Sequence, residues 1–179
     1  MSDTLKYLKG NYNITGVKGE GLFHPEDHGL TPYSSSTACW NGYLTSYEIV
    51  NDGLLLMELL INTKKLKDIN GIEAEKSLGW SFTHQFSHLN LKIPFTGNLL
   101  IGNEFIQSMY VHMGFQRPIT YAKVIELKLK DGNLLESKDI SLRMKEIREN
   151  SKDYPSSPHS QSEEAIGNWI ERSFSRDYD

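Results

Sequence analysis

The chain has 179 residues, of which 38% are hydrophobic and 11% aromatic, a balance typical of one compact domain with a real core. The 19 basic and 23 acidic residues give a formal net charge of -4, and no basic stripe is visible, so we expect no binding to duplex nucleic acid. No stretch approaches the ~20 apolar residues that a membrane helix needs. The first residues also lack the apolar segment of a signal peptide, which predicts a cytoplasmic protein without a membrane partner.

The first 36 residues are rich in Gly, Ser, Pro and His and show no clear periodicity, so we assign no element to them. Within this region His24 and His28 lie in a segment with Pro25 and Gly29, which predicts a loop. A loop would allow the two imidazoles to share a metal ion. An ordinary solvated loop is the interpretation that we prefer.

Residues 43–61 predict a β-hairpin. Residues 43–50 alternate, and one face would carry Tyr43, Thr45, Tyr47 and Ile49. An Asp-Gly pair follows, which favours a hairpin because tight turns between strands need residues at positive φ. The next run is apolar on both faces apart from Glu58, so we expect a central strand. Residues 62–77, by contrast, predict either a short helix or an exposed loop.

A similar unit lies further along the chain. Residues 121–130 alternate as a strand, Asp131 and Gly132 supply the turn, and residues 133–144 alternate again up to Met144. Between the two predicted hairpins, Pro94 indicates an edge strand or a bulge. The likeness of the hairpins reflects shared turn chemistry, which we prefer to an internal repeat.

Two further histidines, His84 and His88, have the spacing of many metal ligands, but residues 80–88 alternate between large and small side chains. This period of two predicts a strand with both histidines on an aromatic face. Residues four apart on a strand are separated by about 13 Å, too far for one metal ion. We therefore predict no metal site and no cofactor.

The last part of the chain changes character. Residues 151–161 form a Pro/Ser linker, and residues 162–176 read as an amphipathic helix with an apolar stripe. We therefore expect a β-rich domain over residues 1–150, the linker, and a helix that docks on the domain or on a partner. The predicted fold is mainly β, an antiparallel sheet rolled into a barrel or sandwich, with a C-terminal α-helix.

Catalytic signatures are absent from the sequence. It has no P-loop, no dinucleotide-binding glycine motif, no nucleophile elbow and no His-Glu-x-x-His motif. The single cysteine, Cys39, cannot form an internal disulfide. No glycine-rich turn exposes it as a nucleophile, so we expect a buried small residue.

Three stretches carry a resemblance. Residues 36–59, "STACWNGYLTSYEIVNDGLLLMEL", resemble a widespread set of small uncharacterised bacterial proteins with a Thr-Ala-x-Trp-Arg-Gly-Tyr segment, a strand, an Asp-Gly turn and an apolar strand. "FTGNLLIG" at 95–102 and "YVHMGFQRPITYAKVIELKLKDGNLL" at 110–135 resemble the same set. Asn41 and Tyr47 depart from its usual Arg and Trp. The resemblance implies a shared fold and a bacterial or phage origin, but no activity.

Large polar and aromatic side chains near glycines at the predicted strand ends mark a candidate ligand site. Its residues are Trp40, Tyr43, Tyr110, His112 and Arg117. Flat rings with one or two cations suit a small anionic or aromatic ligand, for which a nucleotide derivative is one candidate.

The prediction for function is a non-catalytic binding protein of a bacterial or phage conflict system, comparable to an immunity or antagonist protein. It would sequester that ligand or a partner protein, and a homo-oligomer is compatible with this role. The alternative is a hydrolase that uses His112 and histidines from the first third of the chain, with or without a metal ion.

Overall fold

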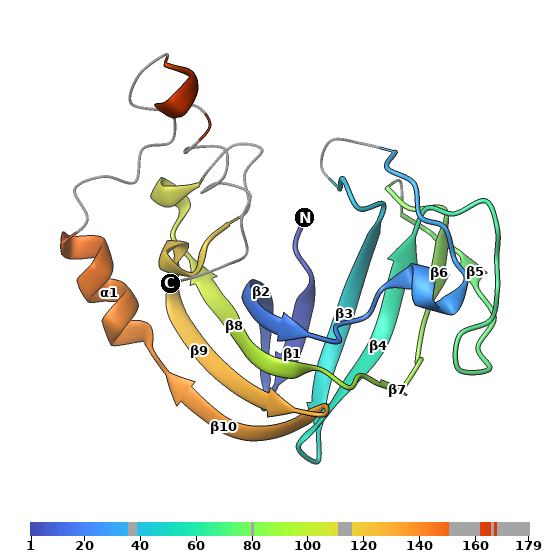
Figure 1. The fold of residues 1–179 in the computed structure, drawn as a ribbon, viewed down its shortest axis with the longest axis horizontal. Helices are drawn as coiled ribbons and strands as arrows, with labels where there is room; N and C mark the ends of the chain where they lie inside the picture. Colours follow the sequence, from blue (N-terminus) through green and yellow to red (C-terminus); the bar gives the residue numbers. More distant parts are fainter. Residues whose placement is uncertain (36–38, 80, 111–115, 151–161, 166, 168–179) are drawn as a thin grey trace.

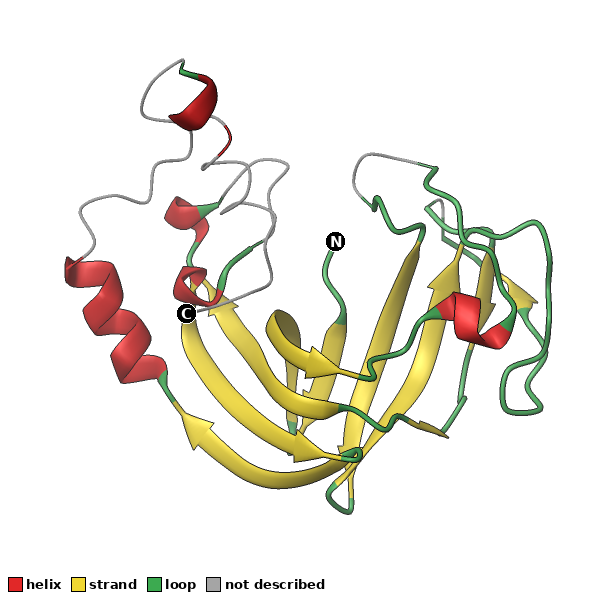
Figure 2. Ribbon diagram, in the orientation of Figure 1, coloured by secondary structure: helices red, strands yellow, loops and turns green. Residues whose placement is uncertain are grey.

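The computed structural model describes residues 1–35, 39–79, 81–110, 116–150, 162–165 and 167. The protein is mainly β, with 48% strand, and forms a closed seven-strand β-barrel followed by helix α1 (Ser141–Asn150) (Figure 1, Figure 2). The predicted fold class is therefore confirmed, as a barrel. Its strands are β1 (Thr4–Tyr7), β2 (Gly10–Glu20), β3 (Tyr43–Val50), β4 (Gly53–Ile61), β8 (Thr96–Phe105), β9 (Tyr121–Lys130) and β10 (Asn133–Asp139).

The strands follow the order β10-β9-β8-β2-β1-β3-β4 around the barrel, and Asn133 of β10 pairs with Gly53 of β4 to close it. Neighbouring strands are antiparallel except for β1 and β3, which are parallel. Three short strands extend the sheet beyond β4. They are β5 (Glu75–Lys76), β6 (His84–Phe86) and β7 (Leu91–Lys92).

Both predicted hairpins are confirmed, and both have two-residue turns. In the second, Asp131 and Gly132 have φ values of 48° and 77°. In the first, the left-handed residues are Asn51 and Asp52, with φ values of 48° and 63°, and Gly53 already begins β4. Asn and Asp tolerate this region better than other non-glycine residues, so the turn lies one residue earlier than the predicted Asp-Gly turn.

A pair of glycines allows β2 and β8 to approach closely. Gly19 and Gly97 are direct partners in the antiparallel ladder, and both have extended but positive φ values, 148° and 145°. A Cβ atom on Gly97 would lie 2.1 Å from the carbonyl oxygen of Lys18. Side chains are therefore excluded at this bend of the barrel wall.

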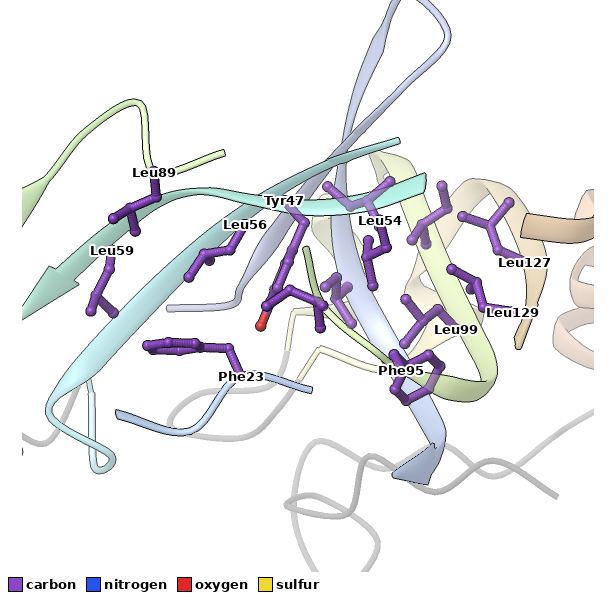
Figure 3. Close-up of a cluster of buried hydrophobic side chains, with 14 of the residues drawn as sticks. Phe23, Tyr47, Leu54, Leu56, Leu59, Leu89, Phe95, Leu99, Leu127 and Leu129 are labelled. Carbon is purple, nitrogen blue, oxygen red and sulfur yellow. The ribbon is translucent and has the colours of Figure 1, made fainter. Parts of the chain in front are cut away.

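The inward-facing side chains of the strands fill the barrel and form its main core (Figure 3). On β9 the buried Ile125, Leu127 and Leu129 alternate with more exposed residues, as a strand with one buried face requires. We call this set the interior cluster. Its largest fully buried members include Phe86, Phe95, Leu56, Leu59 and Leu99.

The predicted strand over residues 133–144 is wrong in its second half. Strand β10 ends at Asp139, and helix α1 (Ser141–Asn150) follows. Ile140 and Met144 share a face because they are one helical turn apart, with the Met144 N–H bonded to the Ile140 carbonyl at 3.0 Å; Leu142 is exposed. The alternation of these three apolar residues was the misleading signal, since a spacing of four also fits a helix.

Helix α1 covers a second, smaller apolar set on the outside of the barrel. We call it the outer cluster, and it consists of Leu100, Tyr121, Val124, Ile140 and Met144. Of the predicted helix over residues 162–176, residues 163–165 and 167 are helical. The remaining residues, and the predicted linker, lie outside the described part of the chain. None of the described helices is long and apolar enough to cross a membrane.

Two other local predictions are resolved by the structure. Residues 62–77, predicted as a short helix or an exposed loop, form a largely exposed loop with an isolated bridge between Ile69 and Ile72 and the two-residue strand β5. The predicted strand over residues 80–88 is reduced to His84–Phe86, and His88 has a φ value of 58°. Phe82 and Phe86 are buried, and they account for the alternation seen in the sequence.

Candidate functional site

Polar side chains lie on the inner face of β3, where an apolar surface would be expected. The alternation of the strand turns Tyr43, Thr45 and Tyr47 toward the interior, and both tyrosines pack against the interior cluster. Thr45 is only 1% exposed and Tyr47 only 4%. The barrel wall therefore carries hydroxyl groups among its leucines and isoleucines.

Asp3 brings a carboxylate to the same place. Because β1 runs parallel to β3, with Thr4 opposite Ser46, the preceding Asp3 lies beside the start of β3. Its Oδ1 accepts a hydrogen bond of 2.9 Å from the Thr45 N–H. We call Asp3, Tyr43, Thr45 and Tyr47 the β3 polar cluster.

The hydroxyl of Tyr47 points into the barrel toward Phe23 (Figure 3). Burial raises its pKa strongly, and the negative charge of Asp3 raises it further. A hydrogen bond from the Phe23 backbone lowers the pKa by a smaller amount. Tyr47 therefore remains a neutral phenol well above its usual titration near pH 10, and it can donate a hydrogen bond.

Thr45 is the unusual member of the cluster. Its Oγ1 atom is fully buried and has no hydrogen-bond partner among the described residues. The Thr45 side chain lies close enough to the Tyr47 hydroxyl to lower its pKa by more than the Phe23 backbone does, but its Oγ1 has no partner that meets hydrogen-bond geometry. Buried hydroxyls are nearly always paired, because an unpaired one costs about 1–3 kcal/mol.

The chain enters β3 through an ordered turn. The Gly42 N–H donates to the Cys39 carbonyl at 3.2 Å, and the Cys39 thiol donates to the Tyr43 carbonyl at 3.2 Å. Cys39 is half-buried, not buried as predicted, because this turn lies at the rim of the barrel. Trp40, in the same turn, is 65% exposed and supplies a flat ring beside the start of β3.

The other predicted site residues lie elsewhere. Tyr110 is half-exposed and meets Phe105 edge-on, and Arg117 caps the 3-10 helix η3 (Pro118–Thr120). Figure 1 draws η3, beyond the end of β8, well apart from the start of β3. His112 lies outside the described residues. Trp40 and Tyr43 thus lie three positions apart, in the turn and at the start of β3, and a ligand that touches all five residues stays a prediction.

Two of the described histidines, His28 and His84, have structural surroundings. His28 ends the 3-10 helix η1 (Pro25–His28) and stacks on Phe23, with ring centroids 4.8 Å apart. His84 contacts the Thr83 hydroxyl through Nδ1 at 2.9 Å. Across the described residues, no group of three or more His, Cys, Asp or Glu side chains could hold a metal ion. The hydrolase alternative depends on His112 and stays a prediction.

Comparisons with known proteins identify no family for this chain. No protein-family model, curated protein or solved structure matches the chain.

Sequence reasoning missed Asp3 and Thr45. Thr45 was placed on one face with Tyr43 and Tyr47, but a threonine in a strand is an ordinary residue. Asp3 preceded a strand that the sequence did not reveal. The signal that could have found the cluster is the run Tyr43-x-Thr45-x-Tyr47, with hydroxyls at three consecutive inward positions.

Proposed function

We propose that the protein is a non-catalytic binding protein that holds, and so sequesters, a small flat ligand at the β3 polar cluster. The carrying observation is the buried Thr45 hydroxyl, which has no hydrogen-bond partner among the described residues. The remaining surroundings fit this role. Tyr43 and Tyr47 supply aromatic surface and hydroxyls, and exposed Trp40 supplies a ring at the rim.

The chemistry of the cluster favours one class of ligand. The Asp3 carboxylate is negative, so it would repel a phosphate placed beside it and attract N–H donors. Tyrosine rings favour a flat partner, and the hydroxyls can both donate and accept hydrogen bonds. A nucleobase or nucleoside, whose edge carries donors and acceptors, meets these requirements. In a nucleotide derivative the phosphates would remain outside the cluster.

Thr45→Val and Thr15→Val test the proposal as a matched pair. Both threonines are 1% exposed, but the Thr15 hydroxyl donates to the Leu100 carbonyl at 3.1 Å. Calorimetric titration with free nucleobases and nucleosides should detect a ligand for the unmodified protein. Loss of one hydrogen bond of about 1–1.5 kcal/mol should weaken binding by Thr45→Val about five- to tenfold, and Thr15→Val should bind normally.

Thermal unfolding of the free variants should give the opposite order. Thr45→Val removes an unpaired hydroxyl and should leave the midpoint unchanged or raised, whereas Thr15→Val should lower it. The proposal fails if no member of the panel binds, or if Thr45→Val binds as tightly as the unmodified protein.

One observation favours a protein partner as a second candidate function. Tyr33, Trp40 and Leu78 are exposed on the loops beside the start of β3, and Leu78 is 98% exposed. The Asn62 side chain ties these loops together by donating to Ser35 Oγ and to the Ser81 carbonyl. A partner on this surface would require Trp40 and Leu78 but not the Thr45 hydroxyl. Capture from host lysate by Thr45→Val, and its loss in Trp40→Ala, would distinguish this function.

A further inference from the structure

Strand β10 has one open edge in the described part of the chain. It pairs with β9 from Asn133 to Asp139, but with β4 only at Asn133. In Figure 1, β10 forms the lower margin of the barrel, and the edge that does not pair with β9 faces away from β9. Residues 135–139 are exposed. Such an edge offers unpaired backbone groups to another strand.

The hairpin geometry shows where those groups lie. The two-residue turn makes Lys130 and Asn133 a hydrogen-bonded pair. Leu134 then turns its backbone away from β9, and its N–H donates to the Asp52 carbonyl at 2.7 Å. The direction of the backbone groups is therefore fixed at the start of β10.

A bulge then resets the alternation. Leu135 is the additional residue, and Glu136 is paired with Lys128. In this arrangement Glu136 and Lys138 turn their backbone groups to β9. Ser137, between them, directs its N–H and C=O to the open side.

A second copy of β10 can complete this edge in one register. In an antiparallel pair centred on Ser137, the two Ser137 residues exchange both backbone hydrogen bonds across a two-fold axis. Glu136 of each copy then faces Lys138 of the other as a non-hydrogen-bonded pair, in which side chains lie closest. The two opposite-charge pairs form by symmetry.

The charges on β9 extend this pattern. Lys128 is opposite Glu136 and Glu126 is opposite Lys138 in the β9–β10 ladder. Across the two-fold axis, one row on the outer face would therefore read Lys128, Glu136, Lys138, Glu126, with the last two from the second copy. The two inner charges, Glu136 and Lys138 of the second copy, each lie between charges of opposite sign, whereas the end residues Lys128 and Glu126 are opposite the neutral Asn98 and Leu100 of β8. Opposite-charge cross-strand pairs stabilise a sheet, and like charges destabilise it.

From the open edge and this charge pattern, we propose that the protein forms a symmetric dimer through antiparallel pairing of β10 with β10 of a second copy. The β3 polar cluster plays no part in the interface, so the dimer and the proposed ligand site are independent.

Charge reversal tests the register. Glu136→Lys and Lys138→Glu each convert two attractive pairs into repulsive ones, so each should raise the dimer dissociation constant at least about tenfold. Analytical ultracentrifugation over a range of concentrations at low salt measures this. The double variant, which exchanges the two charges, should recover the dissociation constant of the unmodified protein.

Mixing the two single variants is the decisive measurement. One variant then carries two lysines at positions 136 and 138 and the other carries two glutamates. The mixture should therefore form a heterodimer with a lower dissociation constant than the dimer of either variant alone. Misfolding cannot produce this rescue, and circular dichroism checks each fold. The proposal is overturned if the unmodified protein is monomeric at all concentrations, if the reversals leave its dimer unchanged, or if mixing restores nothing.

Discussion

The interior cluster and the outer cluster bury side chains of the same strands by different means. Inside the barrel, the sheet closes on itself, and side chains from all around the wall pack against each other. On the outside, Leu100 and Val124 pack, among the described residues, against Ile140 and Met144 at the start of α1. Closure of a sheet is a property of the whole barrel, whereas a docked helix can separate alone. The two regions should therefore differ in how much a lost contact costs.

Leu99 and Leu100 offer the largest contrast. They are neighbours on β8, both are 0% exposed, and they belong to the interior and outer clusters respectively. Leu99→Ala leaves a cavity that the closed wall cannot fill, and it should cost about 4 kcal/mol. Leu100→Ala should cost about 2–3 kcal/mol because α1 can settle toward the sheet. Denaturant unfolding measures both, and equal losses would contradict the comparison.

The buried Tyr47 tests the stability of the interior cluster at alkaline pH. Its pKa is raised in the folded protein by burial and by the charge of Asp3. Its contribution to stability is therefore complete below the unfolded pKa near 10 and is lost as the pH rises further. Above that pH one such group lowers the free energy of unfolding by up to about 1.4 kcal/mol per pH unit. Tyr47→Phe should show a shallower decline between about pH 10 and 11.5, and an unchanged slope would show that Tyr47 ionises freely.

Arg148 tests the attachment of α1. One of its guanidinium nitrogens donates to the carbonyls of Ile119 and Tyr121, at 2.7 and 2.8 Å. Arg148→Met should cost about 1–2 kcal/mol through the loss of these charge-assisted bonds. Hydrogen exchange should show faster opening of α1 but not of β3 or β4. The exposed Arg143→Met is the control, and faster exchange throughout the barrel would refute a local role.

Asp139 gives the smallest effect, at acidic pH. Its pKa is lowered mainly because its carboxylate accepts a hydrogen bond from the Ser141 hydroxyl, and also because it accepts one from the Ser141 N–H. A lowered pKa contributes stability above the unfolded pKa near 3.9, and this is lost as the pH falls below it. Asp139→Asn should therefore flatten the stability profile below about pH 4. Identical stability profiles for the two proteins would show that the Asp139 carboxylate does not stabilise the start of α1.

The hairpins were the most predictable part of the fold. Residues 43–61 and 121–134 combine period-two alternation with turn residues that accept positive φ, and both signals are local. β1 and β2 were missed because Gly16 and Gly19 interrupt β2, and because β1 contains only four residues, Thr4–Tyr7. Neither strand carries a strong pattern by itself, and their pairing with β3 and β8 supplies most of their order.

The candidate site was predictable only in part. Trp40 and Tyr43 are only three positions apart in the chain, so their placement at one end of β3 follows from a short turn. Asp3 and Thr45 are separated by 42 positions, and their contact depends on the parallel pairing of β1 with β3. No spacing rule within one segment can reveal such a contact.

The sequence by itself determined that this protein is mainly β, and where two of its hairpins turn, because side-chain period and turn chemistry act over a few residues. Tertiary structure decided that the sheet closes, that residues after Asp139 become a helix, and that the Thr45 hydroxyl is buried without a partner among the described residues. These outcomes depend on which distant strands pair and on what covers each face. They follow from the free energy of the whole packed barrel and not from any single segment.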